Sequence, residues 1–247
     1  MIINKITTSI KDLDEIASND ANNFSASRKE YWKETKFTDK LLVLYDSLGD
    51  NFNEPCPREL ITILQLYWIC LRSFFISSQL ILQGHIPEAL ALISRAAEAA
   101  GYASKMSKNP DKVKIWVEKE RGQPKDFHDR FGQPFPRDDK LVYPEIYEIY
   151  DTSGEFGRHS NFASTVFFSD FKNLRDKDMI EFRYTDSEDG INFRRSINYV
   201  ISSYKKILLV FKEIFEDFLD DKWLENLKEF GNEYDKHTQG LKSMFLK

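Results

Sequence analysis

The hydrophobic pattern of this chain is mostly helical, because apolar residues recur every three or four positions over long stretches. The longest apolar run, residues 61–84, ends at Gly84, and glycine often adopts the left-handed conformation that follows a helix. Pro87 suits the first turn of the next helix, so we expect an antiparallel helical hairpin here. The pattern predicts helices over residues 24–48, 57–84, 87–107, 143–157, 195–220 and 222–246, with a shorter one beginning at Pro110.

The apolar run 61–84 is also long enough to be considered as a membrane span. Arg72 lies at its centre, where an arginine costs roughly 2.5–3.5 kcal/mol on insertion scales. Three glutamines add polar groups to the run, and no cluster of lysine and arginine flanks it. A helix that is apolar on nearly all sides is typical of the centre of a helical bundle. We therefore favour a buried central helix and expect no membrane partner.

Two segments depart from the helical pattern. Residues 163–194 contain three short aromatic and β-branched runs, and in one of them Ile180, Phe182 and Tyr184 alternate with polar residues. This alternation predicts a small β-hairpin or three-stranded insert near 163–194. Residues 121–140 hold three of the eight prolines, which favours a long, mobile loop. With no internal repeat and no low-complexity linker, residues 1–247 are expected to form one domain, a mainly α antiparallel helical bundle with this β insert.

The composition excludes some classes of function but does not identify one. Only 10 glycines and 8 prolines among 247 residues leave few tight turns, which agrees with long helices. The formal charge of −5 argues against a broad DNA-binding surface, because nonspecific phosphate binding needs an excess of lysine and arginine. The two cysteines form no Cys-x-x-Cys motif and the N-terminus has no secretory pattern, so we expect a cytoplasmic protein.

The familiar motifs for phosphate loops, dinucleotide loops, nucleophile elbows and zinc-binding helices are absent from the sequence. We therefore expect no cofactor and no metal. One remaining candidate is the pair Arg95 and Glu98, which share one face of an alanine-rich helix. If these charges are buried they need partners, so they form either a structural ion pair, for instance with Arg72, or a functional polar pocket.

The second candidate lies where the predicted helix 143–157 ends. Tyr147 and Tyr150 share one side of that helix, and Arg158 and His159 follow it directly. A histidine titrates near neutral pH and can serve as a general acid or base, or as a ligand. The alternative is a histidine that only hydrogen-bonds within a helical core.

Together the two clusters resemble a known group. The order Glu-Ala-Leu and Arg-x-x-Glu in residues 84–98, followed by Tyr-x-x-Tyr-x-x-Ser and His-Ser in residues 147–160, is similar to bacterial helical proteins of a domain of unknown function. That group resembles the HEPN superfamily, and the resemblance covers about residues 60–160. It implies a helical bundle, often a dimer, found in defence and toxin-like systems.

Many HEPN proteins are metal-independent ribonucleases whose arginine and histidine lie a few residues apart on one helix. This chain departs from that pattern, because Arg158 and His159 are adjacent and their side chains would diverge on a helix. A ribonuclease would need Arg95 from another helix to bind phosphate beside His159.

Three functional hypotheses follow, and the sequence leaves open whether the protein is an enzyme. The first is a cytoplasmic HEPN-like interaction or defence-associated module, with a protein partner or a second copy. The second is a metal-independent ribonuclease that acts on RNA, with Arg95 and Arg158 binding phosphate and His159 as general acid/base. The third is a small-ligand sensor whose pocket contains Arg95, Glu98 and the tyrosines.

Overall fold

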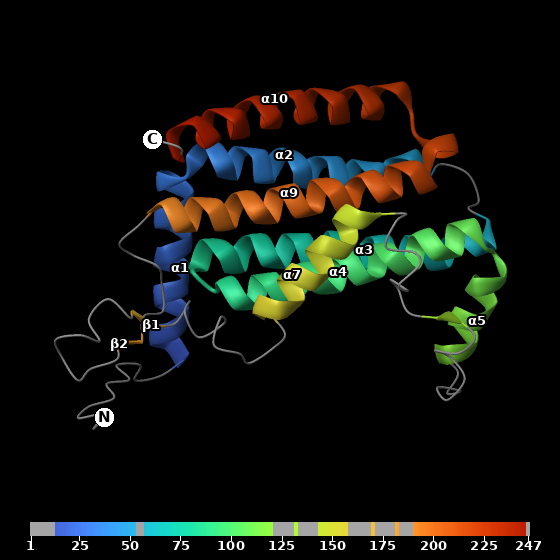
Figure 1. Cartoon of the computed structure of the whole chain (residues 1–247), viewed down its shortest axis with the longest axis horizontal. Coiled ribbons are helices and arrows are strands. Elements are labelled where there is room, and N and C mark those ends of the chain that lie inside the picture. Colours follow the sequence, from blue (N-terminus) through green and yellow to red (C-terminus); the bar gives the residue numbers. More distant parts are fainter. Residues whose placement is uncertain are drawn as a thin grey trace.

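A computed structural model describes residues 13–52, 57–120, 131–132, 143–157, 169–170, 181–182 and 190–245. The helices of this part form a bundle, as predicted, and most of the long ones run side by side (Figure 1). The eight α-helices are α1 (Leu13–Glu30), α2 (Trp32–Leu48), α3 (Arg58–Gln83), α4 (Ile86–Lys108), α5 (Asp111–Glu120), α7 (Pro144–Gly157), α9 (Gly190–Ile214) and α10 (Asp221–Phe245).

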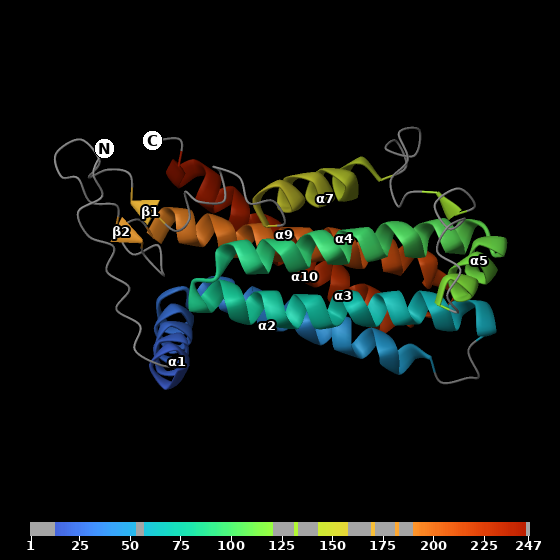
Figure 2. The ribbon, with the colours of Figure 1, turned by 90° about the horizontal axis from the view of Figure 1, so that it is seen from below.

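The predicted hairpin is formed by α3 and α4, which lie antiparallel along the bundle (Figure 2). α3 ends at Gly84, whose φ of 94° is a left-handed conformation that other residues adopt only with strain. The amide of His85 then donates to the carbonyl of Leu80 at 2.8 Å, which closes the turn. The alanines of α4 let its backbone approach α3 closely, and Ala89, Ala96, Ala97, Ala100 and Ala103 are fully buried.

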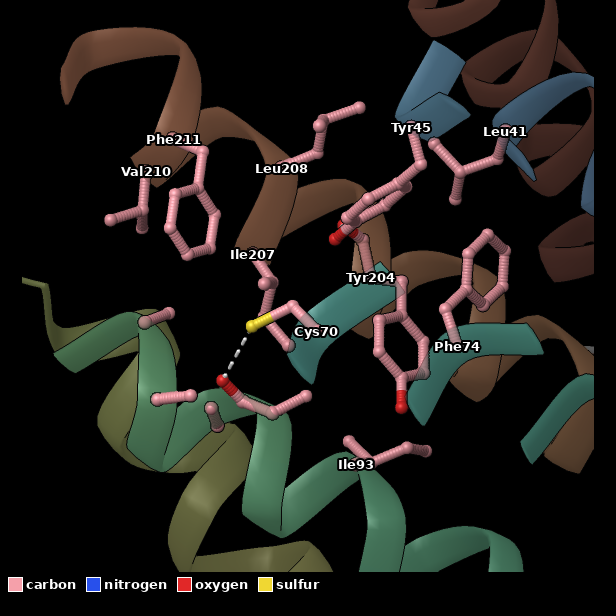
Figure 3. Close-up of a cluster of buried hydrophobic side chains, with 14 of the residues drawn as sticks. Leu41, Tyr45, Cys70, Phe74, Ile93, Tyr204, Ile207, Leu208, Val210 and Phe211 are labelled. Atoms are coloured by element: carbon pink, nitrogen blue, oxygen red, sulfur yellow. Dashed lines mark hydrogen bonds between the residues drawn. The ribbon is translucent and has the colours of Figure 1, made fainter. Parts of the chain in front are cut away.

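An aromatic cluster occupies the centre of the bundle, where α2, α3 and α9 meet (Figure 3). The ring of Phe74 lies 4.6 Å from that of Tyr204 and 5.4 Å from that of Tyr45. Tyr45 donates its hydroxyl to the carbonyl of Tyr204 at 2.8 Å, and the hydroxyl of Tyr67 donates to the carbonyl of Tyr45. Burial raises the pKa of these three tyrosines well above the usual value, so their hydroxyls act only as neutral hydrogen-bonding groups.

Cys70 lies beside this cluster and donates its thiol to the carbonyl of Ala96 at 3.3 Å, the dashed line in Figure 3. Complete burial raises the pKa of the Cys70 thiol, and the positive charge of Arg95 only partly opposes that shift. A buried thiol that stays protonated is a poor nucleophile. Cys70 is therefore a packing residue.

The N-terminal region differs from the prediction of one helix over residues 24–48. The polar segment before residue 24 is part of α1, which crosses the ends of the other helices (Figure 1), and the chain turns at Tyr31. α1 is held by polar contacts that a hydrophobic pattern does not reveal. Asp20 pairs with His85 at 3.1 Å, and the side-chain amide of Asn23 donates to the carbonyl of Gln83 at 3.4 Å.

The predicted β insert is described only in small part. Two-residue strands β1 (Ser169–Asp170) and β2 (Glu181–Phe182) pair antiparallel, with Ser169 opposite Phe182. The rest of 163–189 lies outside the described residues. The third predicted run, residues 191–194, is helical and belongs to α9, because buried Phe193 continues the helical spacing of Ile197 and Val200. Of the predicted loop 121–140, only Phe131 and Gly132 are described, and Phe131 packs against Tyr102 and Trp116.

Adjacent leucines of α9 provide a matched test of this packing. Leu208 is completely buried, whereas Leu209 is 38% exposed. Leu208→Ala is expected to lower the free energy of unfolding by about 2–5 kcal/mol, because it leaves a cavity in the core. Leu209→Ala makes the same chemical change on the same helix and is expected to cost less than about 1 kcal/mol. Urea titration followed by circular dichroism measures both, and equal losses would contradict the assigned core face of α9.

Candidate functional site

Arg95 and Glu98 both lie on α4, three residues apart. Arg95 is exposed and Glu98 is partly buried, so neither is a fully buried charge that requires a structural partner. Arg72 is exposed on α3, and within the described part no salt bridge joins it to Glu98. The surroundings of Glu98 are therefore those of a partly open polar surface.

Glu98 belongs to a small polar cluster between α4 and α7. It lies near Tyr102, whose pKa is raised first by burial and then by the charges of Glu98 and Tyr150. Ser94 donates its hydroxyl to the carbonyl of Tyr150 at 3.2 Å, which joins the two helices directly. Ser153 of α7 is buried, and its hydroxyl donates to the carbonyl of Ile149 within its own helix.

The C-terminal end of α7 lies against α4 at an unusually short distance. A Cβ atom at Gly157 would lie 2.3 Å from the backbone nitrogen of Ala91, so only glycine fits without a shift of one helix. Ala91 precedes Arg95 by one helical turn. Arg158 and His159 follow Gly157 in the sequence but lie outside the described residues.

A different candidate surface, which we call the α2–α3 face, is apolar and exposed. On α3, Ile61, Trp68 and Phe75 are spaced seven residues apart and are 46%, 54% and 50% exposed. Leu64 and Leu71 lie between them and are partly exposed. These five positions form the a and d stripe of a heptad repeat.

A groove of about 500 Å³ runs along this face between α2 and α3, which lie side by side in Figure 2. Its lining is apolar except for one carboxylate and one guanidinium, and consists of Leu42, Val43, Asp46, Trp68, Leu71, Arg72 and Phe75. Sequence reasoning identified the apolar helix but missed this face, because periodicity does not show which side of an all-round apolar helix stays uncovered.

A second cleft, about 560 Å³, lies between α7, α9 and α10. It contains basic side chains, but Lys205 pairs with Asp235 at 2.7 Å and Lys206 lies 3.8 Å from Glu145. These pairs leave little net positive charge for an anionic ligand.

Sequence reasoning also missed a buried charge cluster at one end of the bundle. The carboxylate of Glu34, only 3% exposed, lies 3.0 Å from Nε of Arg194 and 3.5 Å from Nε2 of His237. The three residues come from α2, α9 and α10 and share no local motif. The cluster joins these helices, because the guanidinium of Arg194 compensates the charge of the buried carboxylate and the imidazole of His237 packs beside it.

The pKa of His237 is lowered from its usual value of about 6.5. Burial is the largest cause, Glu34 opposes it, and the positive charges of Lys33 and Arg194 reinforce it. The neutral imidazole is thus the form that the fold favours.

Stability should therefore depend on pH through His237. As the pH falls below about 6.5, the unfolded chain takes up a proton before the folded chain does, so the free energy of unfolding decreases. His237→Gln removes the titrating group and is expected to show a smaller loss between pH 7.5 and 5.5 than the unaltered protein. Urea titrations of both proteins at the two pH values measure this, and identical losses would contradict a role for His237.

The part of the chain that the structure describes contains no group of three metal-ligating side chains. One helix in that part, Leu60–Gln83, is long and apolar enough to cross a membrane, and much of it is buried inside the bundle. No protein family, curated protein or solved structure matches the chain.

Proposed function

We propose that the protein is a helical protein-interaction module whose α2–α3 face packs against the same face of a second copy. The observation that carries this proposal is the exposed heptad stripe of α3, which leaves Ile61, Trp68 and Phe75 about half exposed. Large contiguous apolar patches on soluble proteins mark interaction sites. Complete burial of one such side chain contributes about 1.5–3 kcal/mol, so covering several of them can stabilise a complex.

The spacing of the stripe specifies the type of partner. Side chains at a and d positions insert between four residues of a facing helix, so a heptad stripe is matched by another helix. A second copy supplies such a helix with the same stripe. It also supplies matching charge, because the face carries one acidic and one basic side chain, Asp46 and Arg72, and is therefore complementary to itself.

A membrane surface is a poorer occupant of the same face. Asp46 and Arg72 are both exposed on it, and lipid would have to receive them without a partner. The rest of α3 is covered by α4 and α9, so the helix cannot enter a bilayer without leaving the bundle. A homodimeric interaction module in the cytoplasm is also what the HEPN-like resemblance supports, and a defence-associated role is part of this proposal.

The mass of the protein in solution tests the proposal. At micromolar concentration, sedimentation equilibrium is expected to give twice the 29.1 kDa chain mass. Trp68→Glu places a charge in the stripe and is expected to weaken the dimer at least about 30-fold, the effect of losing an interface hot spot. The control is Leu209→Glu, which places the same charge on an exposed apolar residue of the second cleft. It should leave the dimer intact.

A monomeric wild-type protein at all concentrations would contradict the proposal. Co-sedimentation of the wild-type protein with lipid vesicles, abolished by Trp68→Glu, would show a membrane as the occupant instead. Circular dichroism confirms that each variant is folded.

As a second candidate, we propose a metal-independent ribonuclease site between α4 and α7. The observation that favours it is the close contact of Gly157 with Ala91, because it brings the end of α7 within one helical turn of Arg95. In this site Arg95 and Arg158 would bind phosphate and His159 would act as general acid/base. Glu98 would lie at the edge of the site, near Tyr102.

Incubation of the purified protein with tRNA, with and without EDTA, tests this candidate. Cleavage is expected to resist EDTA and to fall about 10²–10⁴-fold in His159→Ala, the usual contribution of a general acid/base. Arg95→Ala should also reduce cleavage, whereas Lys228→Ala, an exposed basic residue of α10, should not. No cleavage by the wild-type protein, or equal cleavage by His159→Ala, would exclude the site.

A further inference from the structure

We infer that Asp46 and Arg72 set the register of the dimer, each Arg72 facing the partner subunit's Asp46. This inference rests on the proposed homodimer. Asp46 comes from α2 and Arg72 from α3, and both side chains are exposed at the lining of the apolar groove. They are the two charged residues among the seven that form this lining, and they carry opposite signs.

Both charges lack an ion-pair partner among the residues that the structure describes. Neighbouring charges of α2 behave differently, since Asp39 pairs with Arg28 at 2.7 Å and Lys40 pairs with Glu233. A groove that is otherwise apolar thus carries two unpaired charges, and covering it with an apolar partner would leave both without compensation.

Arg72 lies beside the heptad stripe of α3, at a position that influences which helix packs against the stripe. It directly follows Leu71 of the heptad stripe, and charged residues that flank such a stripe determine pairing and orientation in coiled coils. The equivalent positions one heptad earlier and later are the uncharged Gln65 and Gln79, both exposed. Between residues 60 and 83 α3 carries no acidic side chain, so the charge that neutralises Arg72 has to come from another helix.

In a twofold dimer, the partner subunit's Asp46 can neutralise Arg72, and the same contact occurs at two places. In a contact between identical faces, if residue i of one copy touches residue j of the other, then j also touches i. Pairing Arg72 with the partner subunit's Asp46 therefore forms two identical ion pairs, one at each side of the apolar stripe. Any register that brings the two Arg72 side chains together is disfavoured, because like charges repel across an interface. The charges thus select a second copy over other apolar helices.

Charge reversal at the two positions tests the inference. In an Asp46→Lys homodimer, two cations face each other at both of the symmetric contacts. In an Arg72→Glu homodimer, two anions face each other at both contacts. Each single variant is expected to dimerise at least about tenfold more weakly than the wild-type protein. When the two variants are mixed, the new lysine of one copy faces the new glutamate of the other, while the remaining wild-type pair is intact. The mixture should therefore form a heterodimer more strongly than either variant forms a homodimer.

Native mass spectrometry with one variant labelled with ¹⁵N distinguishes the heterodimer from both homodimers. Glu225→Lys, which reverses an exposed charge on α10, is the control and should not restore pairing with Arg72→Glu. If the wild-type protein dimerises but the mixture shows no preference for the heterodimer, the assigned pairing is wrong and the proposed dimer stands. If the wild-type protein is monomeric, the proposed function itself fails.

Discussion

The burial of one helix, α3, is the constraint on which the rest of this structure depends. Its 26 residues are apolar on nearly every side, so water must be excluded from nearly every side. The small side chains of α4 cover one side and the aromatic residues of α9 cover another. α2 covers a third side incompletely and leaves the stripe from Ile61 to Phe75 exposed. The proposed contact with a second copy would exclude water from this remaining stripe.

Polar side chains at the centre and at one end of the bundle connect neighbouring helices. The hydroxyls of Tyr45 and Tyr67 reach backbone carbonyls, so these rings fill the centre without leaving a buried donor unpaired. At the end of the bundle, the charge of Glu34 is compensated by Arg194, and His237 from a third helix packs beside the carboxylate. Asp46 and Arg72 are the contrast, since they are exposed at an apolar groove and have no partner in the described part of the chain. That contrast supports their assignment to an intermolecular contact.

The sequence predicted the long helices well, because each of α3, α4, α9 and α10 repeats its apolar residues over many turns. It failed for α1, which is polar and depends on contacts such as Asp20 with His85 that join distant parts of the chain. The cluster around Glu34 could not be found either, because three helices each contribute one residue. Arg95 and Glu98 were correctly placed on one face of a helix, whereas Arg158 and His159 lie outside the described residues and stay predictions.

The solvent exposure of Trp68 reports directly on whether a second copy covers the α2–α3 face. The protein has four tryptophans, so 5-fluorotryptophan labelling gives four ¹⁹F signals, and Trp68→Phe identifies the one from Trp68. The difference between its shift in H₂O and in D₂O reports contact with solvent. If a second copy covers the face, this difference is large in dilute protein and falls as the concentration rises through the dimerisation range. A Trp68 signal that stays equally exposed at every concentration would show that no second copy covers this face.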